Sequence, residues 1–262
     1  MRTSSGASCA GGMTLPVQTL VLASGNRGKL REFDELLQPL GWQVQPQSVF
    51  GIEPPEETEH SFRGNALLKA RHAALHSGQA ALADDSGLEV DLLGGAPGVY
   101  SARYAGPQAS DADNLAKLLA ALAAVPEGQR QARFRCVIAF VRSADDPDPI
   151  VGEGVWEGYI LPAPRGSGGF GYDPVFADLH THLSAAEMSS SEKNLRSHRA
   201  MALRDFLARS SGALAASCAI RVLFPLNESL GATVPRGSDL QSFVLECILT
   251  LLLMLVILSV SF

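Results

Sequence analysis

The segment from Thr19 to Leu37 limits the possible folds more than any other stretch of the chain. Thr19–Ala23 is a continuous apolar run of strand length, typical of a central strand covered on both faces. It leads directly into the loop Ser24–Lys29, and apolar side chains then recur at helical spacing from Leu30 to Leu37. We therefore expect a strand, a glycine-containing loop and a helix in succession, with the helix ending before Pro39.

This loop has the properties of a phosphate-binding site. Backbone N–H groups at the start of a helix are free donors with partial positive charge, and glycines let them approach an anion closely. It is not a Walker loop, because only two residues separate Gly25 from Gly28 and Leu30 replaces the Ser/Thr of that motif. A helix-capping turn with a solvated lysine fits equally well. The candidate phosphate-binding residues are Ser24, Gly25, Asn26, Arg27, Gly28 and Lys29.

A second short apolar run, Ala80–Ala83, is followed by two adjacent carboxylates, Asp84 and Asp85. Ser86 and Gly87 come next, so we expect the strand to end and the chain to turn there. Side chains alternate between the two faces of a strand, so one carboxylate faces a cleft while the other braces the turn. Carboxylates at a strand end suit Mg²⁺, which takes oxygen ligands. An Asx-turn that closes the strand is the alternative.

The chain between these two segments offers further polar groups. Prolines exclude a helix interior from the acidic stretch Glu53–Glu59, which is either a solvated loop or a source of one metal-binding glutamate. Ser61–Ser77 has the pattern of a helix with Asn65 and Lys69 on one stripe. That stripe is either the solvent-exposed face or one wall of a phosphate cleft.

Two later segments are candidates for contacts with a nucleotide. Gly166–Phe176 is too aromatic for a flexible linker, and it fits either a loop that holds an aromatic ring against a base or a structural glycine loop. Lys193, His198 and Arg199 form a compact group of hydrogen-bond donors. The alternative is that these residues only form the surface of a helix. From the first segment the candidates are Phe170, Gly171, Tyr172 and Asp173.

The remaining periodicities predict an α/β domain without internal repeats. We expect a strand and turn at 42–52, further strands at 133–142 and 151–161, and helices at 111–125 and from about 200 onward. Residues 88–93 continue apolar, with Glu89 and Asp91 interspersed. Net charge is −6, which argues against nonspecific nucleic-acid binding. The four cysteines are scattered without a C-x-x-C pair, so neither zinc nor disulfides are indicated, and a cytoplasmic enzyme fits best.

Three regions are expected along the chain. Residues 1–16 have the composition of a loose extension or a weak transit peptide, 17–211 of a catalytic domain, and 212–262 of a linker plus an apolar tail. The tail, 243–262, has close to the length needed to span a membrane. A membrane anchor, a helix packed on the domain and a tail of non-biological origin remain open for it.

Taken together, these segments resemble the inosine/xanthosine triphosphate pyrophosphatase family. The residues that carry the resemblance occur in the family's order and cover about Thr19 to Arg209. They are Ser24–Lys29, Glu56–Thr58, Phe62–Ala70, Ala83–Leu88, Gly94–Tyr104, Gly168–Phe176 and Ser197–Leu203.

The resemblance implies an elongated α/β fold, with a long central mixed sheet and two lobes around a nucleotide cleft. It also implies a Mg²⁺-dependent homodimer that cleaves ITP, dITP and XTP between the α- and β-phosphates. By resemblance Asp85 is the proton acceptor, Glu56 and Asp85 are metal ligands, and Ser24–Lys29 are the phosphate loop. Implied substrate contacts are Ser86, Phe170, Gly171, Tyr172, Asp173, Lys193, His198 and Arg199.

Two rival functions remain at this stage. One is a related-fold pyrophosphatase for modified pyrimidine nucleotides, against which the segments around Phe170 and His198 argue. The other is a nucleotide-binding regulator without turnover. The presence of Lys29, Glu56 and Asp85 argues against it.

Overall fold

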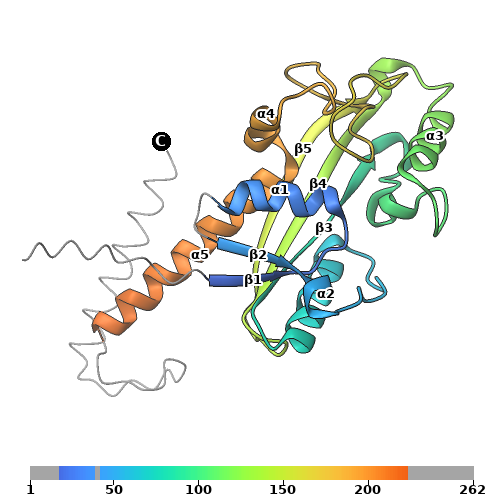
Figure 1. Ribbon diagram of the computed structural model, residues 1–262. Coiled ribbons are helices and arrows are strands. Elements are labelled where there is room, and N and C mark those ends of the chain that lie inside the picture. Colours follow the sequence, from blue (N-terminus) through green and yellow to red (C-terminus); the bar gives the residue numbers. More distant parts are fainter. Residues whose placement is uncertain (1–17, 39–41, 224–262) are drawn as a thin grey trace, which may run out of the picture. The chain divides into compact units, whose positions relative to one another are not determined.

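A six-stranded mixed sheet organises the computed structural model, which describes residues 18–38 and 42–223 (Figure 1). The strand order is β2–β1–β3–β4–β5–β6. β1 runs parallel to β2 and β3, whereas β3, β4, β5 and β6 are successively antiparallel. The strands are β1 (Gln18–Leu22), β2 (Trp42–Pro46), β3 (Ala81–Val90), β4 (Gln131–Val141), β5 (Ile150–Ile160) and β6 (Phe176–Asp178). The predicted α/β fold with a central mixed sheet is confirmed.

Side-chain caps define where several helices begin. Asn26 caps the first helix by accepting from the N–H groups of Gly28 and Lys29, and Ser61 caps the second by accepting from Gly64. The helices are α1 (Arg27–Leu37), α2 (Phe62–Ser77), α3 (Asp111–Ala121), α4 (Ser190–Arg196) and α5 (His198–Leu223). α1 follows β1 and a loop as predicted, but it begins at Arg27, inside the segment Ser24–Lys29 that was expected to be loop.

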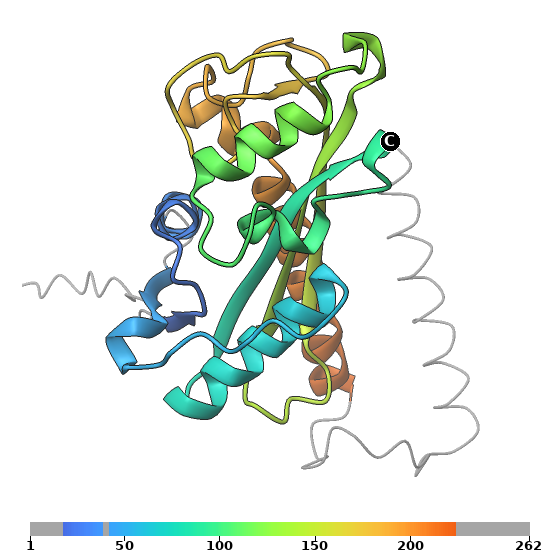
Figure 2. The same cartoon turned by 90° about the vertical axis from the view of Figure 1, so that its right-hand side faces the viewer.

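Helices cover both faces of the sheet (Figures 1 and 2). The small residues of α2, including Ala66 and Ala70, pack on one face against Ala83 and Ala139. α1 and α5 pack on the other face, where Leu22, Phe33, Ile138 and Phe206 belong to one buried cluster. A third cluster lies between α3, the segment 172–188 and the far halves of β3, β4 and β5. The cleft described below is therefore held by a packed framework on each side.

The expected chain turn after Asp85 is wrong, because β3 continues without interruption from Ala81 to Val90. Gly87 is not a turn residue. A Cβ at this position would lie 2.3 Å from the carbonyl oxygen of Gly98 and 2.5 Å from Oγ of Ser101. The glycine is required for close approach by the 3-10 helix η4 (Gly98–Arg103), and it leaves both aspartates in mid-strand.

Other helices and strands end at different residues than expected. The strand expected at 42–52 is β2 followed by the 3-10 helix η2 (Gln47–Phe50), and α3 ends at Ala121 rather than near 125. The expected linker after 211 begins with residues that continue α5 to Leu223, because no proline or glycine interrupts 213–223.

The terminal regions limit what is described. α1 ends at Leu37, before Pro39, as expected. The expectations for residues 1–16 and for the tail 243–262 lie outside the described residues. Within residues 18–38 and 42–223, no helix is both long enough and apolar enough to cross a membrane. Contacts divide the chain into two compact units, Met1–Leu214 and Ala215–Phe262, and the first contains the sheet.

Candidate active site

The site lies where β1 ends beside the continuing strand β3. β1 pairs with β3 only through Val21 and Leu22, and the chain then leaves the sheet in the loop that precedes α1. The next residues of β3 are therefore without a paired strand on that side, and they include Asp84 and Asp85. The carboxyl end of a parallel strand is where open α/β sheets bind ligands.

Asp84 faces α1 and α5. Its Oδ2 lies 2.9 Å from Nζ of Lys29 and 3.6 Å from Nε of Arg199, and Oγ of Ser86 donates to it at 3.1 Å. Burial opposes its ionisation, but the charges of Lys29 and Arg199 hold the pKa of Asp84 well below its ordinary value. Asp84 is therefore a fixed anion that joins the phosphate-loop lysine to the start of α5.

Asp85 faces α2, on the opposite side of the strand, as the alternation of strand side chains predicts. Nζ of Lys69 donates to its Oδ1 at 2.8 Å and Nδ2 of Asn65 donates to its Oδ2 at 3.3 Å. Burial raises the pKa of Asp85, against the opposing effect of Lys69 and Lys29. A carboxylate whose proton affinity is raised in this way is suited to accept a proton from water.

The polar stripe of α2 is thus not a solvent-exposed face. Asn65 is 0% exposed and Lys69 is 9% exposed. Lys69 also donates to Glu57 at 3.1 Å, and Glu57 accepts a further bond from Arg103. The polar face of α2 is therefore buried and holds the carboxylate of Asp85 in place.

The acidic loop presents its two central glutamates differently. Glu57 is half-buried against Lys69, whereas Glu56 is exposed. Among the described residues, no group of three or more His, Cys, Asp or Glu side chains is arranged to hold a metal ion. The donor set still fits Mg²⁺, which is commonly held by one or two carboxylates together with substrate phosphates. The buried Oδ1 of Asp84 has no hydrogen-bond partner.

The aromatic loop closes onto the phosphate loop. A Cβ at Gly28 would lie 2.5 Å from a ring atom of Phe170, so only glycine allows this contact. Asp173 accepts the N–H of Phe170 at 2.9 Å, and Asp111 accepts the N–H of Gly171 at 2.9 Å. The hydroxyl of Tyr172 donates to the carbonyl of Ser101. The N–H groups of Phe170 and Gly171 therefore already have acceptors within the protein.

Lys193 and Arg199 meet at one carboxylate of α1. Nζ of Lys193 lies 3.2 Å from Glu32 and 2.9 Å from Asp173, and Arg199 donates to both Glu32 and Ser86. Both cations lie over the ring of Phe170, at 6.0 and 5.3 Å from its centroid. The predicted substrate contacts from three distant segments are thus gathered at the start of α1.

His198 is buried, like Arg199 beside it. It is 5% exposed and stacks on Phe134 with ring centroids 4.7 Å apart. Its buried Nδ1 has no hydrogen-bond partner. Burial, followed by the charges of Arg199 and Lys193, lowers the pKa of His198 well below its ordinary value, so the ring is neutral at physiological pH.

Five cations of the site each have a carboxylate within 4.0 Å. The cations are Lys29, Lys69, Arg103, Lys193 and Arg199, and the carboxylates are Glu32, Glu57, Asp84, Asp85 and Asp173. The positive charges of these five side chains are therefore already paired within the protein.

Sequence reasoning missed three of these residues as site components. Glu32 and Glu57 are ordinary acidic residues in the sequence, although Glu32 follows Lys29 at helical spacing. Asp111 reaches Gly171 across sixty residues of chain, and no local pattern announces that contact.

Comparison with known proteins gives consistent matches. A model of the Ham1 family matches residues 20–209. A dITP/XTP pyrophosphatase of Methylococcus capsulatus is 60% identical over 183 residues, covering 70% of this chain and 91% of that protein. One of Thioalkalivibrio sulfidiphilus is 55% identical over 193 residues, covering 74% and 98%. A solved HAM1 protein from Coxiella burnetii is 47% identical, with a TM-score of 0.68, covering 74% of this chain and 98% of that chain.

Proposed function

The chain belongs to the Ham1 family, and on that premise we propose that it hydrolyses the deaminated purine nucleotides ITP, dITP and XTP to the monophosphate and pyrophosphate. Relatives that are 60% and 55% identical carry the name dITP/XTP pyrophosphatase. The observation that carries the proposal is the pair of adjacent aspartates, one a fixed anion and the other a carboxylate of raised proton affinity, at the edge of the phosphate loop. The activity removes these nucleotides from the nucleotide pool.

Asp85 is the general base of this proposal. Its raised pKa keeps its conjugate acid stable enough to receive a proton, and Lys69 and Asn65 fix the carboxylate's orientation. The carboxylate removes a proton from water as the water attacks the α-phosphorus, and pyrophosphate leaves. General-base catalysis of this kind contributes about 10²–10⁴-fold in rate.

In this proposal the phosphate loop contributes positive charge rather than free backbone N–H donors. The side chain of Asn26 already accepts the N–H groups of Gly28 and Lys29, as the helix-capping interpretation of this loop expects. Lys29, paired with Asp84, is the full positive charge placed at the loop. We propose that phosphate oxygens compete for Lys29 and for the start of α1 when the nucleotide binds.

The pairing of the site's cations with carboxylates supports dependence on Mg²⁺. A triphosphate adds several negative charges to a site whose cations are already paired, so cations must arrive with it. We propose Asp85 and Glu56 as the protein ligands, with phosphate oxygens completing the shell. When bound, the ion neutralises phosphate charge and lowers the pKa of water.

Base selectivity is proposed to rest on donors at the 6-position. Hypoxanthine and xanthine present an acceptor there, whereas adenine presents a donor. The N–H groups of Phe170 and Gly171 already have acceptors, and Arg199 already donates to Glu32 and Ser86. This favours His198, whose Nδ1 has no hydrogen-bond partner, as the donor. Leaving such a buried donor unpaired costs about 1–3 kcal/mol, roughly tenfold to a hundredfold in discrimination. Comparing His198→Ala with the wild type on ITP and ATP tests this, since an unchanged ratio of kcat/KM values would refute it.

The proposed activity has a direct test. Purified protein is incubated with ITP, dITP, XTP, ATP and dUTP, with Mg²⁺ or with EDTA, and pyrophosphate and phosphate are measured separately. We expect pyrophosphate and monophosphate from the first three only, and only with Mg²⁺. Release of phosphate, or preference for dUTP, would favour a different phosphohydrolase. We also propose a cytoplasmic homodimer, which light scattering of the purified chain tests.

A further inference from the structure

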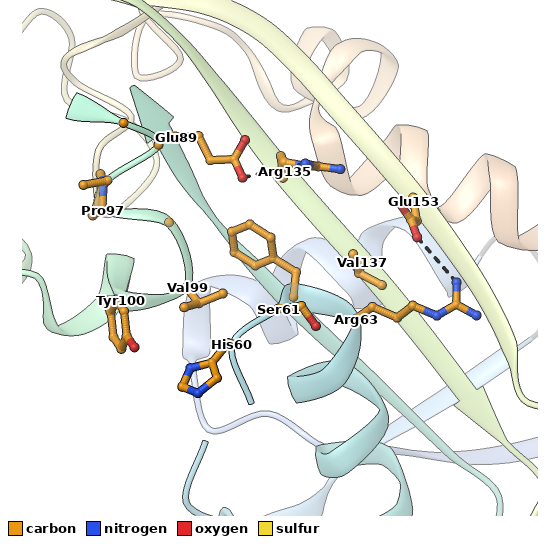
Figure 3. Close-up of a pocket in the computed structure, with 15 residues that line it drawn as sticks. His60, Ser61, Arg63, Glu89, Pro97, Val99, Tyr100, Arg135, Val137 and Glu153 are labelled. Atoms are coloured by element: carbon orange, nitrogen blue, oxygen red, sulfur yellow. Dashed lines mark ion pairs between the residues drawn. The ribbon is translucent and has the colours of Figure 1, made fainter. Parts of the chain in front are cut away.

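A hollow of about 540 Å³ lies between the start of α2 and the loop Gly94–Tyr100 (Figure 3). Arg63 and Glu153 face each other at its rim, 3.6 Å apart. None of the residues assigned above to the catalytic cleft lines this hollow. It is therefore separate from the groups that would hold a nucleotide.

A smaller hollow, of about 290 Å³, does reach those groups, because it lies between α3 and the aromatic loop Gly166–Phe176. Its lining comprises Asp111, Ala112 and Leu115 from the helix, and Ser167–Gly171 and Pro174 from the loop. The half-buried Phe170 thus borders open space as well as contacting Gly28 of the phosphate loop. Since side chains do not fill the space between loop and helix, packing alone does not fix the position of the ring.

Hydrogen bonds restrain the tip of the aromatic loop instead. Oδ2 of Asp173 accepts the N–H of Phe170 at 2.9 Å, and Oδ2 of Asp111 accepts the N–H of Gly171 at 2.9 Å. Asp173 belongs to the loop itself, whereas Asp111 belongs to α3. The bond from Asp111 therefore ties the loop tip to a separate element across the hollow.

α3 is itself firmly attached to the central sheet. Asn114, one turn after Asp111, is 2% exposed. Its side chain accepts the N–H of Ala105 at 2.7 Å and donates to the carbonyl of Ala102 at 3.1 Å. Ala102 lies in η4, which packs against β3 at Gly87. Asp111 is therefore fixed to the same framework that carries Asp85.

We propose that Asp111 is a positioning residue for nucleotide binding. Its carboxylate holds Gly171 so that the ring of Phe170 lies where it can stack on the purine. The inference rests on the proposed function, in which Phe170 is a substrate contact, and it adds a residue that makes no contact with the substrate itself. Stacking on an aromatic ring tolerates any base, because every base has a π-face. Asp111 therefore contributes to affinity for purine nucleotides in general rather than to the choice between bases.

The kinetic consequence follows from the distance between this contact and the chemistry. The bond between Asp111 and Gly171 does not involve Asp85 or its partners Lys69 and Asn65. Stacking holds the base equally in the ground state and in the transition state. Losing such uniform binding raises KM and leaves kcat unchanged.

The test compares the wild type with Asp111→Ala, Asp111→Asn and Asp113→Ala. Asn keeps an acceptor oxygen at position 111, whereas Ala has none. Asp113→Ala is the matched control, because Asp113 is an exposed carboxylate of the same helical turn that bonds to Ser110 rather than to the aromatic loop. Thermal unfolding checks that each variant is folded.

We expect Asp111→Ala to raise KM at least about fivefold, the effect of losing one hydrogen bond of ordinary strength. The rise should be by the same factor for ITP and for XTP, with kcat unchanged. Asp111→Asn should restore most of the affinity, and Asp113→Ala should leave KM unchanged. A fall in kcat without a rise in KM, or an equal rise in Asp113→Ala, would overturn the positioning role.

Amide hydrogen exchange of the ligand-free variants, followed by mass spectrometry, tests the restraint without relying on turnover. We expect peptides that contain residues 166–172 to exchange several-fold faster in Asp111→Ala than in the wild type or in Asp113→Ala. Unchanged exchange would overturn the restraint, whatever the activity. Faster exchange with an unchanged KM would overturn its part in nucleotide binding. A wild type that turns over neither ITP nor XTP would overturn the proposed function, and the exchange rates would then judge the restraint by itself.

Discussion

At the scale of single residues, the two adjacent aspartates differ through their surroundings. Asp84 has a side chain that is 0% exposed, and it neutralises Lys29 and Arg199. Asp85 is also buried, but its pKa is raised rather than lowered. The fold therefore favours the ionised form of the first carboxylate and disfavours that of the second.

Replacing each aspartate by asparagine should separate stability from catalysis. Asp84→Asn leaves Lys29 without its carboxylate partner and Arg199 with Glu32 alone, and we expect a loss of about 3–5 kcal/mol in unfolding free energy. Asp85→Asn removes a charge that burial disfavours, and Lys69 keeps Glu57, so its loss should be clearly smaller. Urea unfolding at pH 7.5 measures both, and equal losses would show that the two environments are not distinct.

His198 gives a pH prediction. Its folded pKa is lowered, whereas in the unfolded chain it is about 6.5, so below that pH the unfolded state binds a proton that the folded state does not. Stability contributed by the neutral ring is present above pH 6.5 and is lost as the pH falls below it. Between pH 7.5 and 5.5 the wild type should lose about 1 kcal/mol more than His198→Phe, which retains the stack on Phe134. Identical pH dependence by chemical unfolding would contradict the lowered pKa.

At the scale of elements, η4 packs against β3 at Gly87, where there is no room for a side chain. Gly87→Ala would place a methyl group 2.3 Å from the carbonyl oxygen of Gly98, and we expect a destabilisation of roughly 1–3 kcal/mol. Gly128→Ala is the control, because a Cβ there meets nothing within 4 Å. Denaturant midpoints compare them, and a neutral Gly87→Ala would mean that η4 yields readily.

The contrast between β1 and β3 shows what sequence patterns specify. The apolar run before Ser24 and the helical spacing after it define β1, the loop and α1, and strand alternation separates Asp84 from Asp85. The sequence Asp-Ser-Gly, however, suggests a turn, because the local pattern contains no trace of η4 packing on Gly87. Likewise, the polar stripe of α2 is ambiguous until the position of Asp85 identifies it as buried.

At the scale of the whole molecule, the site depends on contacts between distant segments. Glu32 of α1 joins Lys193 and Arg199 across more than 160 residues, and Asp111 holds Gly171 from the start of α3. Such pairs are specified by tertiary packing, so a single sequence read alone does not reveal them. The motif residues could be identified as candidates, but their counter-ions could not.

From the ion pairs of the site we also expect turnover of the nucleotide to depend on Mg²⁺. Because each cleft cation described above is already paired, we expect ITP turnover to fall at least about 100-fold when Mg²⁺ is replaced by EDTA, and added K⁺ to restore little of it. Steady-state assays at constant ionic strength measure this. Full activity in EDTA would show that the side-chain cations alone suffice.

The central claim is that Asp85 is the base that activates water. The direct measurement is the rate of pyrophosphate release from ITP by wild type and Asp85→Asn, with nucleotide binding measured in parallel. We predict a drop in kcat of about 10²–10⁴-fold, with the dissociation constant for ITP within about tenfold of the wild-type value. An Asp85→Asn enzyme that retains a tenth or more of the wild-type rate would contradict the claim.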